Sequence, residues 1–240
     1  MRLAAYYMEK TNLAATTVII PALNEAGNIH QLVHEVRAVA PVEVIVVDNG
    51  STDSTAEEAK AAGAQVVSEP RRGYGYACAA GAAAAHDSDV LVFMDGDYSF
   101  SPADLPLLLL PILEGQADLV LGSRELGTIV LGAMPPHQRF GNWMVSRLMN
   151  ALYGLSITDL GPYRGIRRHL LTELDMQEMT YGWPTEMIVK SAKRGARIME
   201  VPVSYHNRRF GQSKVSGTLR GTILAAWYIL SVTFRYAWKK

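Results

Sequence analysis

Short apolar runs alternate with segments of helical spacing through the first half of the chain. Residues 16–20 and 43–47 form two such runs, and each is followed by a polar turn and then by a helical pattern. Further strands are predicted at 65–68, 90–94 and 118–121. Strands that alternate with helices in this way indicate an α/β fold built on a parallel sheet.

Two polar segments carry signals for the start of a helix. Ser54 precedes Glu57 by three residues, the spacing at which two side chains cap each other's backbone amides. Ser101 is followed by Pro102, and proline suits the first position of a helix. We expect helices to begin at both places, and a further helix over about 142–153 in the less regular second half.

Polar clusters follow four of the five predicted strands. They are the segments 21–25, 48–53, 95–97 and 122–124. In open parallel sheets the ligand lies beyond the carboxyl ends of the strands. The position of these clusters therefore predicts one binding site at that edge of the sheet.

Asp95, Gly96 and Asp97 close the apolar run 90–94. Because side chains alternate along a strand, the two carboxylates can point the same way, and Gly96 lets a ligand approach the backbone. Such oxygen ligands suit Mg²⁺ or Mn²⁺, which fill their remaining positions with water and phosphate oxygens. The pair predicts a metal site for a diphosphate, although a solvated turn after a core strand is the alternative for an isolated Asp-x-Asp.

Length and composition bound the class of protein. A chain of 240 residues that is 49% hydrophobic fits one large domain over 1–240, with a ligand-binding half at 16–124 and a second half at 125–240. Lys and Arg total 23 against 23 Asp and Glu, so no net field recruits nucleic acid, and a small-molecule partner is expected.

Cysteine use and hydropathy bear on the compartment. The single Cys78 excludes a disulfide framework and fits a reducing compartment. Residues 1–15 do not resemble a secretory signal, and the apolar stretches 105–113 and 222–234 fall short of the roughly 20 residues that span a bilayer. We expect a cytoplasmic protein.

Four motifs occur in an order that resembles the glycosyltransferases of family 2. They are VIIPALNE at 18–25, VVDNGSTD at 46–53, MDGD at 94–97 and LGSR at 121–124. The segments 200–205 and 209–214 resemble the branch that contains dolichyl-phosphate mannose and glucose synthases. The resemblance implies a GT-A fold, a Rossmann-like, mostly parallel sheet flanked by helices. It also implies inverting, metal-dependent transfer of a hexose from a UDP- or GDP-sugar.

The resemblance also implies roles for individual residues. The nucleoside pocket would be lined by Pro21, Ala22, Asn24 and Glu25, and Asp48 would contact the base or ribose. Asp95, with Gly96 beside it, and Asp97 would hold ribose and metal, and Asp97 is the better candidate for direct ligation.

Four basic side chains are candidates for phosphate contacts. Arg124 and Arg139 carry fork-shaped donors that match phosphate oxygens, and an ordinary surface arginine is the alternative for each. Arg209 and Lys214 resemble part of a loop that closes over the donor diphosphate, and a solvated basic turn is the competing interpretation.

The need for a catalytic base depends on the acceptor. A hydroxyl acceptor would require a carboxylate to remove its proton, whereas a lipid phosphate is already ionised. Asp159, at a family position near the acceptor, and Glu186 are the candidates, and for both the alternative is a structural ion pair with an arginine such as Arg164.

Two features depart from the lipid-phosphate branch. Ser99 stands where a glutamine usually follows the metal-binding pair, and no transmembrane segments follow the catalytic domain. Apolar residues at helical spacing near the C-terminus are Leu219, Ile223, Trp227, Leu230 and Phe234. Core packing, a homodimer interface or membrane-surface docking aided by Arg235, Lys239 and Lys240 would each explain this helix.

Two other functions share these features. A sugar nucleotidyltransferase also uses a nucleotide and a metal, but it would carry a Gly-rich, Arg- and Lys-containing turn where this chain has PALNE at 21–25. A non-catalytic sugar-nucleotide-binding partner subunit would keep the fold, although the intact acidic pair argues against it.

Overall fold

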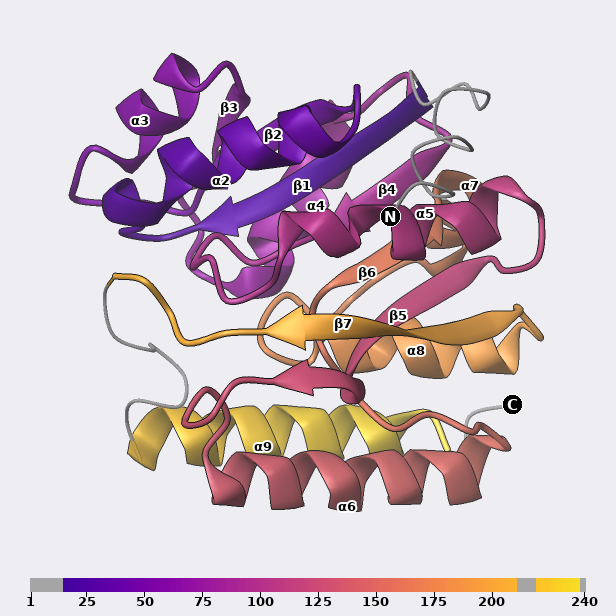
Figure 1. Ribbon diagram of the computed structural model, residues 1–240. Coiled ribbons are helices and arrows are strands. Elements are labelled where there is room, and N and C mark those ends of the chain that lie inside the picture. The colour runs from indigo at the N-terminus through magenta and orange to yellow at the C-terminus, as the bar shows by residue number, and fades with distance from the viewer. Residues whose placement is uncertain (1–14, 211–218, 238–240) are drawn as a thin grey trace.

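The computed structural model describes residues 15–210 and 219–237, with the side chains of 219–223 left aside (Figure 1). Its strands are β1 (Thr16–Ala22), β2 (Glu43–Asp48), β3 (Gln65–Ser68), β4 (Val90–Phe93), β5 (Leu119–Ile129), β6 (Arg164–Arg167) and β7 (Ile198–Tyr205). Its helices are α2 (Ala26–Val39), α3 (Thr55–Ala61), α4 (Tyr74–Ala84), the short 3₁₀ turn η2 (Pro102–Asp104), α5 (Leu105–Leu113), α6 (Pro136–Tyr153), α7 (Arg168–Leu174), α8 (Trp183–Lys193) and α9 (Leu219–Arg235).

One mixed sheet runs through both halves of the chain. The strand order is β3-β2-β1-β4-β6-β5-β7, and neighbouring strands are parallel except where β6 lies antiparallel to β4 and β5. The predicted mostly parallel α/β sheet is confirmed. The antiparallel β6 was not predicted, because its sequence RGIR carries no apolar run.

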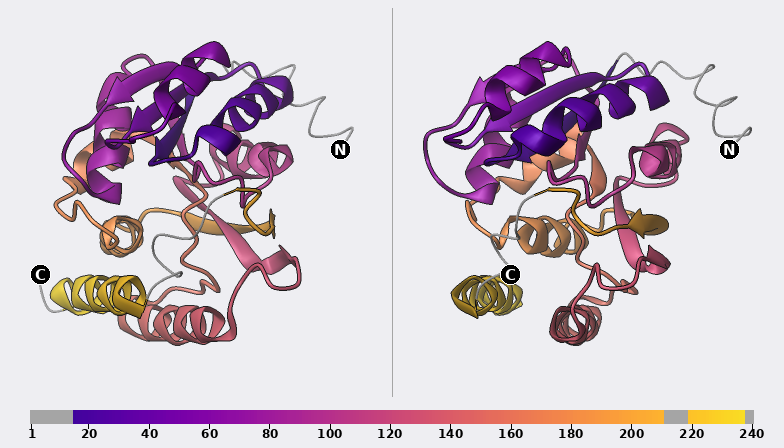
Figure 2. Two further views of the ribbon diagram at one scale, coloured as in Figure 1. Left: turned by 90° about the vertical axis from the view of Figure 1, so that its left-hand side faces the viewer. Right: turned by 60° about the vertical axis from the view of Figure 1, so that its left-hand side comes forward.

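Helices cover both faces of the sheet, so the hydrophobic core has one part on each face. Side chains of β1 alternate between the two parts. Val18 and Ile20 pack with α2 and α5, whereas Ile19 points to the other side and packs with α4. The helices α7 and α8 cover that second side further along the sheet, and α6 and α9 lie at one end of the molecule (Figures 1 and 2). A rigid layered core of this kind fixes the ends of the strands, where the polar clusters lie.

Element boundaries differ from the predictions at several points. β5 extends to Ile129 because its outer part pairs with β7 across an irregularity in register. α6 starts at Pro136, six residues before the predicted start of this helix at about 142, and ends at Tyr153 as predicted. α3 begins beside Ser54 as expected, but no side-chain capping bond forms there, and Ser101 likewise precedes η2 without one.

α6 and α9 run alongside each other, and the Tyr153 hydroxyl donates to the Thr233 carbonyl at 2.5 Å. Val232 and Thr233 are buried, while Trp227 and Phe234 are 69% and 42% exposed. α9 therefore combines core packing on one side with an exposed apolar side. In the described part of the chain, no helix has the length and apolarity needed to cross a bilayer.

Candidate active site

A cavity of about 420 Å³ opens beyond the carboxyl ends of β1 to β4. It brings together six of the predicted site residues, Pro21, Ala22, Glu25, Asp95, Gly96 and Asp97. Gly96 lies close under β1, since a Cβ built on it would be 3.2 Å from the Pro21 carbonyl oxygen. The cavity therefore lies at the edge of the sheet where the sequence places the ligand.

Asp97 is held from two sides. Its Oδ1 accepts hydrogen bonds from the Ser99 amide at 2.9 Å and the Ser99 hydroxyl at 2.5 Å. Its Oδ2 lies 2.6 Å from Nη2 of Arg208, whose Nη1 lies 3.4 Å from Glu25 Oε1. Ser99, the residue that departs from the family pattern, thus orients the carboxylate directly.

Asp95 is the less satisfied of the two carboxylates. Its Oδ1 is buried and lacks a hydrogen-bond partner in the part of the chain that the structure describes. Burial, followed by the charge of Asp97, raises the pKa of Asp95 to about 7. A cation beside the pair would supply the missing partner and favour the ionised form.

The two carboxylates suit a hard divalent cation whose coordination shell is completed by oxygen atoms of a bound ligand. Among the described residues there is no cluster of three His, Cys, Asp or Glu side chains that could hold a metal alone. Two carboxylates beside an open cavity leave several coordination positions for phosphate and water oxygens, as Mg²⁺ and Mn²⁺ require. The orphaned oxygen of Asp95 and the cavity next to it therefore fit such an ion.

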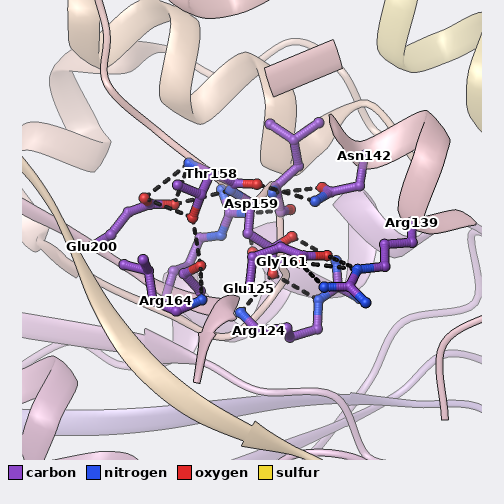
Figure 3. A network of polar contacts seen from close by, with 12 residues as sticks. Arg124, Glu125, Arg139, Asn142, Thr158, Asp159, Gly161, Arg164 and Glu200 are labelled. Atoms are coloured by element: carbon purple, nitrogen blue, oxygen red, sulfur yellow. Dashed lines mark hydrogen bonds and ion pairs between the residues drawn. The ribbon is translucent and has the colours of Figure 1, made fainter. Parts of the chain in front are cut away.

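Arg124 and Asp159 form a bidentate ion pair (Figure 3). Arg124 Nε and Nη2 lie 2.8 and 2.7 Å from the two carboxylate oxygens, and the Arg124 amide donates to the same side chain at 2.8 Å. Burial alone would raise the pKa of Asp159, but the charge and hydrogen bonds of Arg124 outweigh it and leave the pKa below its usual value. Asp159 therefore pairs with Arg124 and not with Arg164, the arginine named in the prediction. Arg164 instead donates to backbone carbonyls, including that of Pro184 at 2.7 Å.

Glu200 of β7 holds the backbone next to this ion pair (Figure 3). Its carboxylate accepts the amides of Thr158 and Asp159 at 2.9 and 3.0 Å. The Arg124 guanidinium also stacks over the Tyr205 ring at 5.0 Å. These contacts fix the orientation of Arg124, which, like Asp159, does not line the cavity.

Glu186 is placed differently from the residues around the cavity. It is fully buried in α8, and its Oε2 accepts the amides of Gln177 and Glu178 at 3.0 and 2.7 Å. Its Oε1 accepts from the Tyr236 hydroxyl at 2.5 Å and lies 2.9 Å from Lys190 Nζ. The carboxylate does not line the cavity, so its contacts favour the structural interpretation.

Asn24 and Asp48 organise the rim of the site from outside the cavity lining. The Asn24 side chain accepts the Thr52 amide at 2.8 Å, and its backbone has a φ of 53°. Asp48 Oδ1 accepts the Ser51 amide at 2.9 Å. Asn24 thus ties the turn after β1 to the turn after β2, and Asp48 stabilises the turn after β2.

The remaining predicted basic residues lie apart. Arg139 forms a bidentate pair with Glu125 (Figure 3). It also lines a separate groove of about 800 Å³ beside α6. Arg209 stacks over Tyr98 at 4.3 Å and donates to Gln31. Lys214 lies outside the described residues.

Several residues that line the cavity were not predicted. They are Leu23, Asn49, Arg72, Gly73, Tyr74, Ala77, Thr180, Tyr181, Arg208, Leu224 and Tyr228. Arg72 and Gly73 follow β3, so the rule used for the other strand ends would have found them. Arg208 follows β7 and lies next to Arg209, which was chosen in its place.

This fold and cavity define a GT-A enzyme, and comparison with known proteins identifies the family. The model of "Glycosyl transferase family 2" matches residues 17–175, so the chain belongs to glycosyltransferase family 2. The chain is 39% identical over 221 residues to an uncharacterized glycosyltransferase of Mycobacterium tuberculosis. The aligned region covers 90% of this chain and 98% of that protein.

Two further relatives agree with the predicted branch. The undecaprenyl-phosphate mannosyltransferase of Micrococcus luteus is 33% identical over 85% of this chain and 88% of its own length. The polyprenol monophosphomannose synthase of Mycolicibacterium smegmatis is 33% identical over 85% and 82%. The resemblance to the branch of dolichyl-phosphate mannose and glucose synthases is thereby confirmed.

Solved structures agree with the GT-A fold. Glucosyl-3-phosphoglycerate synthase of Mycobacterium tuberculosis superposes with a TM-score of 0.78 at 25% identity, covering 99% of this chain and 86% of that chain. The same enzyme in complex with Mn²⁺, uridine diphosphate and phosphoglyceric acid gives a TM-score of 0.74 at 25% identity, with 95% and 80% covered.

Proposed function

We propose that this glycosyltransferase moves a hexose, with inversion and with help from Mg²⁺ or Mn²⁺, from a UDP- or GDP-sugar to a polyprenyl phosphate. The observation that carries the proposal is the acidic pair Asp95 and Asp97 lining the cavity at the strand ends. The relatives named for undecaprenyl-phosphate and polyprenol substrates, and the neighbour bound to Mn²⁺ and uridine diphosphate, support it.

The proposed donor lies in the cavity. Pro21, Ala22 and Glu25 line its β1 side, and Asp95 and Asp97 would hold the metal there. When bound, the metal ion offsets the negative charge that develops on the leaving nucleoside diphosphate. Arg72 and Arg208, which also line the cavity, would add positive charge around the same phosphates.

The acceptor oxygen would attack the anomeric carbon from the side opposite the diphosphate. A new bond forms between this oxygen and the sugar, and the bond to the diphosphate breaks, with its electron pair leaving on the nucleoside diphosphate. Such a displacement inverts the anomeric configuration. Arg124, held in a fixed orientation by Asp159, would attract such a phosphate acceptor.

The contacts of the two candidate bases favour an ionised acceptor. Both oxygens of Asp159 are bound to Arg124, and both oxygens of Glu186 are bound within the α8 region. A carboxylate held in this way is a poor proton acceptor, whereas a phosphate oxygen needs no base. We infer that the nucleophile is a phosphate oxygen and not a hydroxyl.

A transfer assay with matched acceptors tests this function. Purified protein would be given labelled UDP- and GDP-hexoses with Mn²⁺, together with undecaprenyl phosphate or undecaprenol. We expect labelled lipid from undecaprenyl phosphate alone, and loss of product with EDTA. Product from undecaprenol would contradict the phosphate acceptor. Formation of a nucleotide sugar from UTP or GTP and a sugar phosphate would indicate a nucleotidyltransferase, and no turnover with any donor would indicate a binding subunit.

We further propose that the end of the molecule formed by α6 and α9 docks on an anionic membrane surface. On α6, Phe140 is 62% exposed and Trp143 is 53% exposed. On α9, Trp227 is 69% exposed and Phe234 is 42% exposed. Arg147 stacks over Trp143 at 5.7 Å, which places a cation beside the exposed ring. Aromatic side chains with basic neighbours suit the interfacial zone of a bilayer, where a polyprenyl phosphate would be found.

Vesicle sedimentation tests the docking surface. The double variant Trp143→Ser with Trp227→Ser should lose binding to vesicles containing phosphatidylglycerol. The control Leu107→Ser removes an exposed apolar side chain of α5, 37% exposed, and should bind like the wild type. Equal binding by all three proteins would contradict docking. A concentration-dependent dimer that the double variant abolishes would assign the surface to a homodimer instead.

A further inference from the structure

Arg208 occupies the carboxylate oxygen that a metal ion would need. Its Nη2 lies 2.6 Å from Asp97 Oδ2, and its Nη1 lies 3.4 Å from Glu25 Oε1. The Asp97 and Glu25 side chains are only 6% and 7% exposed, so this contact is shielded from solvent on the carboxylate side. A guanidinium therefore already balances the charge of Asp97 in this structure.

The other oxygen of Asp97 is committed as well. The amide and hydroxyl of Ser99 both donate to Oδ1, which uses its two lone pairs. A divalent ion must therefore approach Oδ2, directly beside the Arg208 guanidinium. Two cations at one oxygen repel each other, so the ion pair and the metal compete for Asp97.

The backbone around Arg208 is anchored on both sides. The His206 amide donates to the Ser99 carbonyl at 2.8 Å, and the Asn28 side chain donates to the Phe210 carbonyl at 3.3 Å. These bonds fix the backbone on either side of Arg208. The Arg208 side chain itself is 26% exposed and lines the cavity. The side chain can thus change partners without displacing the anchored backbone.

We propose that Arg208 exchanges Asp97 for the donor diphosphate when metal and nucleotide bind together. Metal alone meets an Asp97 oxygen that is already paired with Arg208. A nucleoside diphosphate brings both oxygen ligands for the metal and a new anionic partner for the guanidinium, so the exchange becomes favourable. Arg208 is then both a diphosphate ligand and the residue that makes metal binding depend on nucleotide. This inference rests on the proposed metal-dependent donor site.

Mn²⁺ binding without nucleotide tests the exchange independently of activity. Titrations followed by electron paramagnetic resonance would compare the wild type, Arg208→Gln and Arg209→Gln. Arg208→Gln should bind Mn²⁺ about tenfold more tightly, because Asp97 is freed. Arg209→Gln is the matched control, since it removes the same charge from the next residue, which contacts Tyr98 and Gln31 instead. It should bind Mn²⁺ like the wild type.

The affinity for nucleotide should change in the direction opposite to the affinity for Mn²⁺. With saturating Mn²⁺, Arg208→Gln should bind UDP or GDP about tenfold more weakly than the wild type, because it lacks the diphosphate contact.

Three outcomes would overturn the inference. The first is unchanged or weaker Mn²⁺ binding by Arg208→Gln without nucleotide. The second is an equal gain in Mn²⁺ affinity in Arg209→Gln, which would show that the loss of one positive charge causes the effect and not the loss of the Asp97 contact. The third is a wild type that binds no Mn²⁺ even with UDP or GDP, and this result alone would also overturn the proposed metal-dependent function.

Discussion

Asp159 holds Arg124 through both carboxylate oxygens, although the two residues are 35 positions apart in the chain. Asp159 is fully buried and the Arg124 side chain is 13% exposed, so neither charge is stable there without the other. The pair connects β5 to the segment before β6. A charge that the fold immobilises in this way can orient a phosphate without a further loss of side-chain entropy.

Breaking this pair should make stability depend differently on pH. Asp159→Asn leaves Arg124 without its countercharge, and we expect it to lower the free energy of unfolding by about 3 kcal/mol at pH 7. Because the folded-state pKa of Asp159 is lowered, its ionised form contributes stability above the unfolded pKa of about 4, and this contribution is lost as the pH falls through the folded value. Urea unfolding of both proteins should show their difference constant above about pH 5 and shrinking below about pH 4. A difference that persists unchanged in acid would contradict the assigned ionisation.

Replacing Glu186 should reduce stability and spare catalysis. The Glu186 carboxylate accepts from two backbone amides, the Tyr236 hydroxyl and Lys190. Glu186→Gln turns one acceptor oxygen into a donor and should lower the free energy of unfolding by about 1–3 kcal/mol. A general base contributes about 100-fold or more to rate, so kcat should change by less than about threefold if Glu186 is structural. A fall of about 100-fold in kcat with unchanged stability would restore Glu186 as the base.

Gly75 lies where α4 packs closely against the backbone of Glu178 and Met179. A Cβ at this position would come within 2.5 Å of Met179 Cα and 2.6 Å of the Glu178 carbonyl oxygen. Gly75→Ala should therefore lower the free energy of unfolding by about 1–3 kcal/mol or more.

Gly141 of α6 provides the matched control for Gly75. A Cβ added there meets nothing within 4 Å, so Gly141→Ala should raise stability by up to about 1 kcal/mol through helix propensity. Urea midpoints of the two variants should move in opposite directions. A loss of stability in both would show that the packing at Gly75 is not the cause.

Much of the first half could be predicted from local pattern. The strand at 65–68 has the predicted bounds, and those at 16–22, 43–48 and 90–93 differ from prediction by one or two residues at one end. Buried parallel strands have distinctive apolar runs, and the ligand edge of such a sheet follows from their direction. The acidic pair and the turn after β1 were found for this reason.

The second half depends on contacts between distant segments, which no local pattern encodes. Arg208 reaches Asp97 from 111 positions away because β7 ends beside the cavity, and only the sheet order brings them together. Arg209 was predicted at the diphosphate, but the direction of the backbone after β7 turns its side chain toward Tyr98. The pairing of Asp159 with Arg124, and not Arg164, depends in the same way on how the segment before β6 folds back.

The most direct test of the whole account is nucleotide- and metal-dependent thermal stabilisation of the wild type and Asp97→Asn. The wild type should be stabilised by UDP- or GDP-sugars with Mn²⁺ and much less without it, because binding to the folded state raises the melting temperature. Asp97→Asn keeps the shape of the side chain but removes its charge, and it should lose the Mn²⁺-dependent part of the shift. Full Mn²⁺-dependent stabilisation of Asp97→Asn would contradict a metal site at the acidic pair.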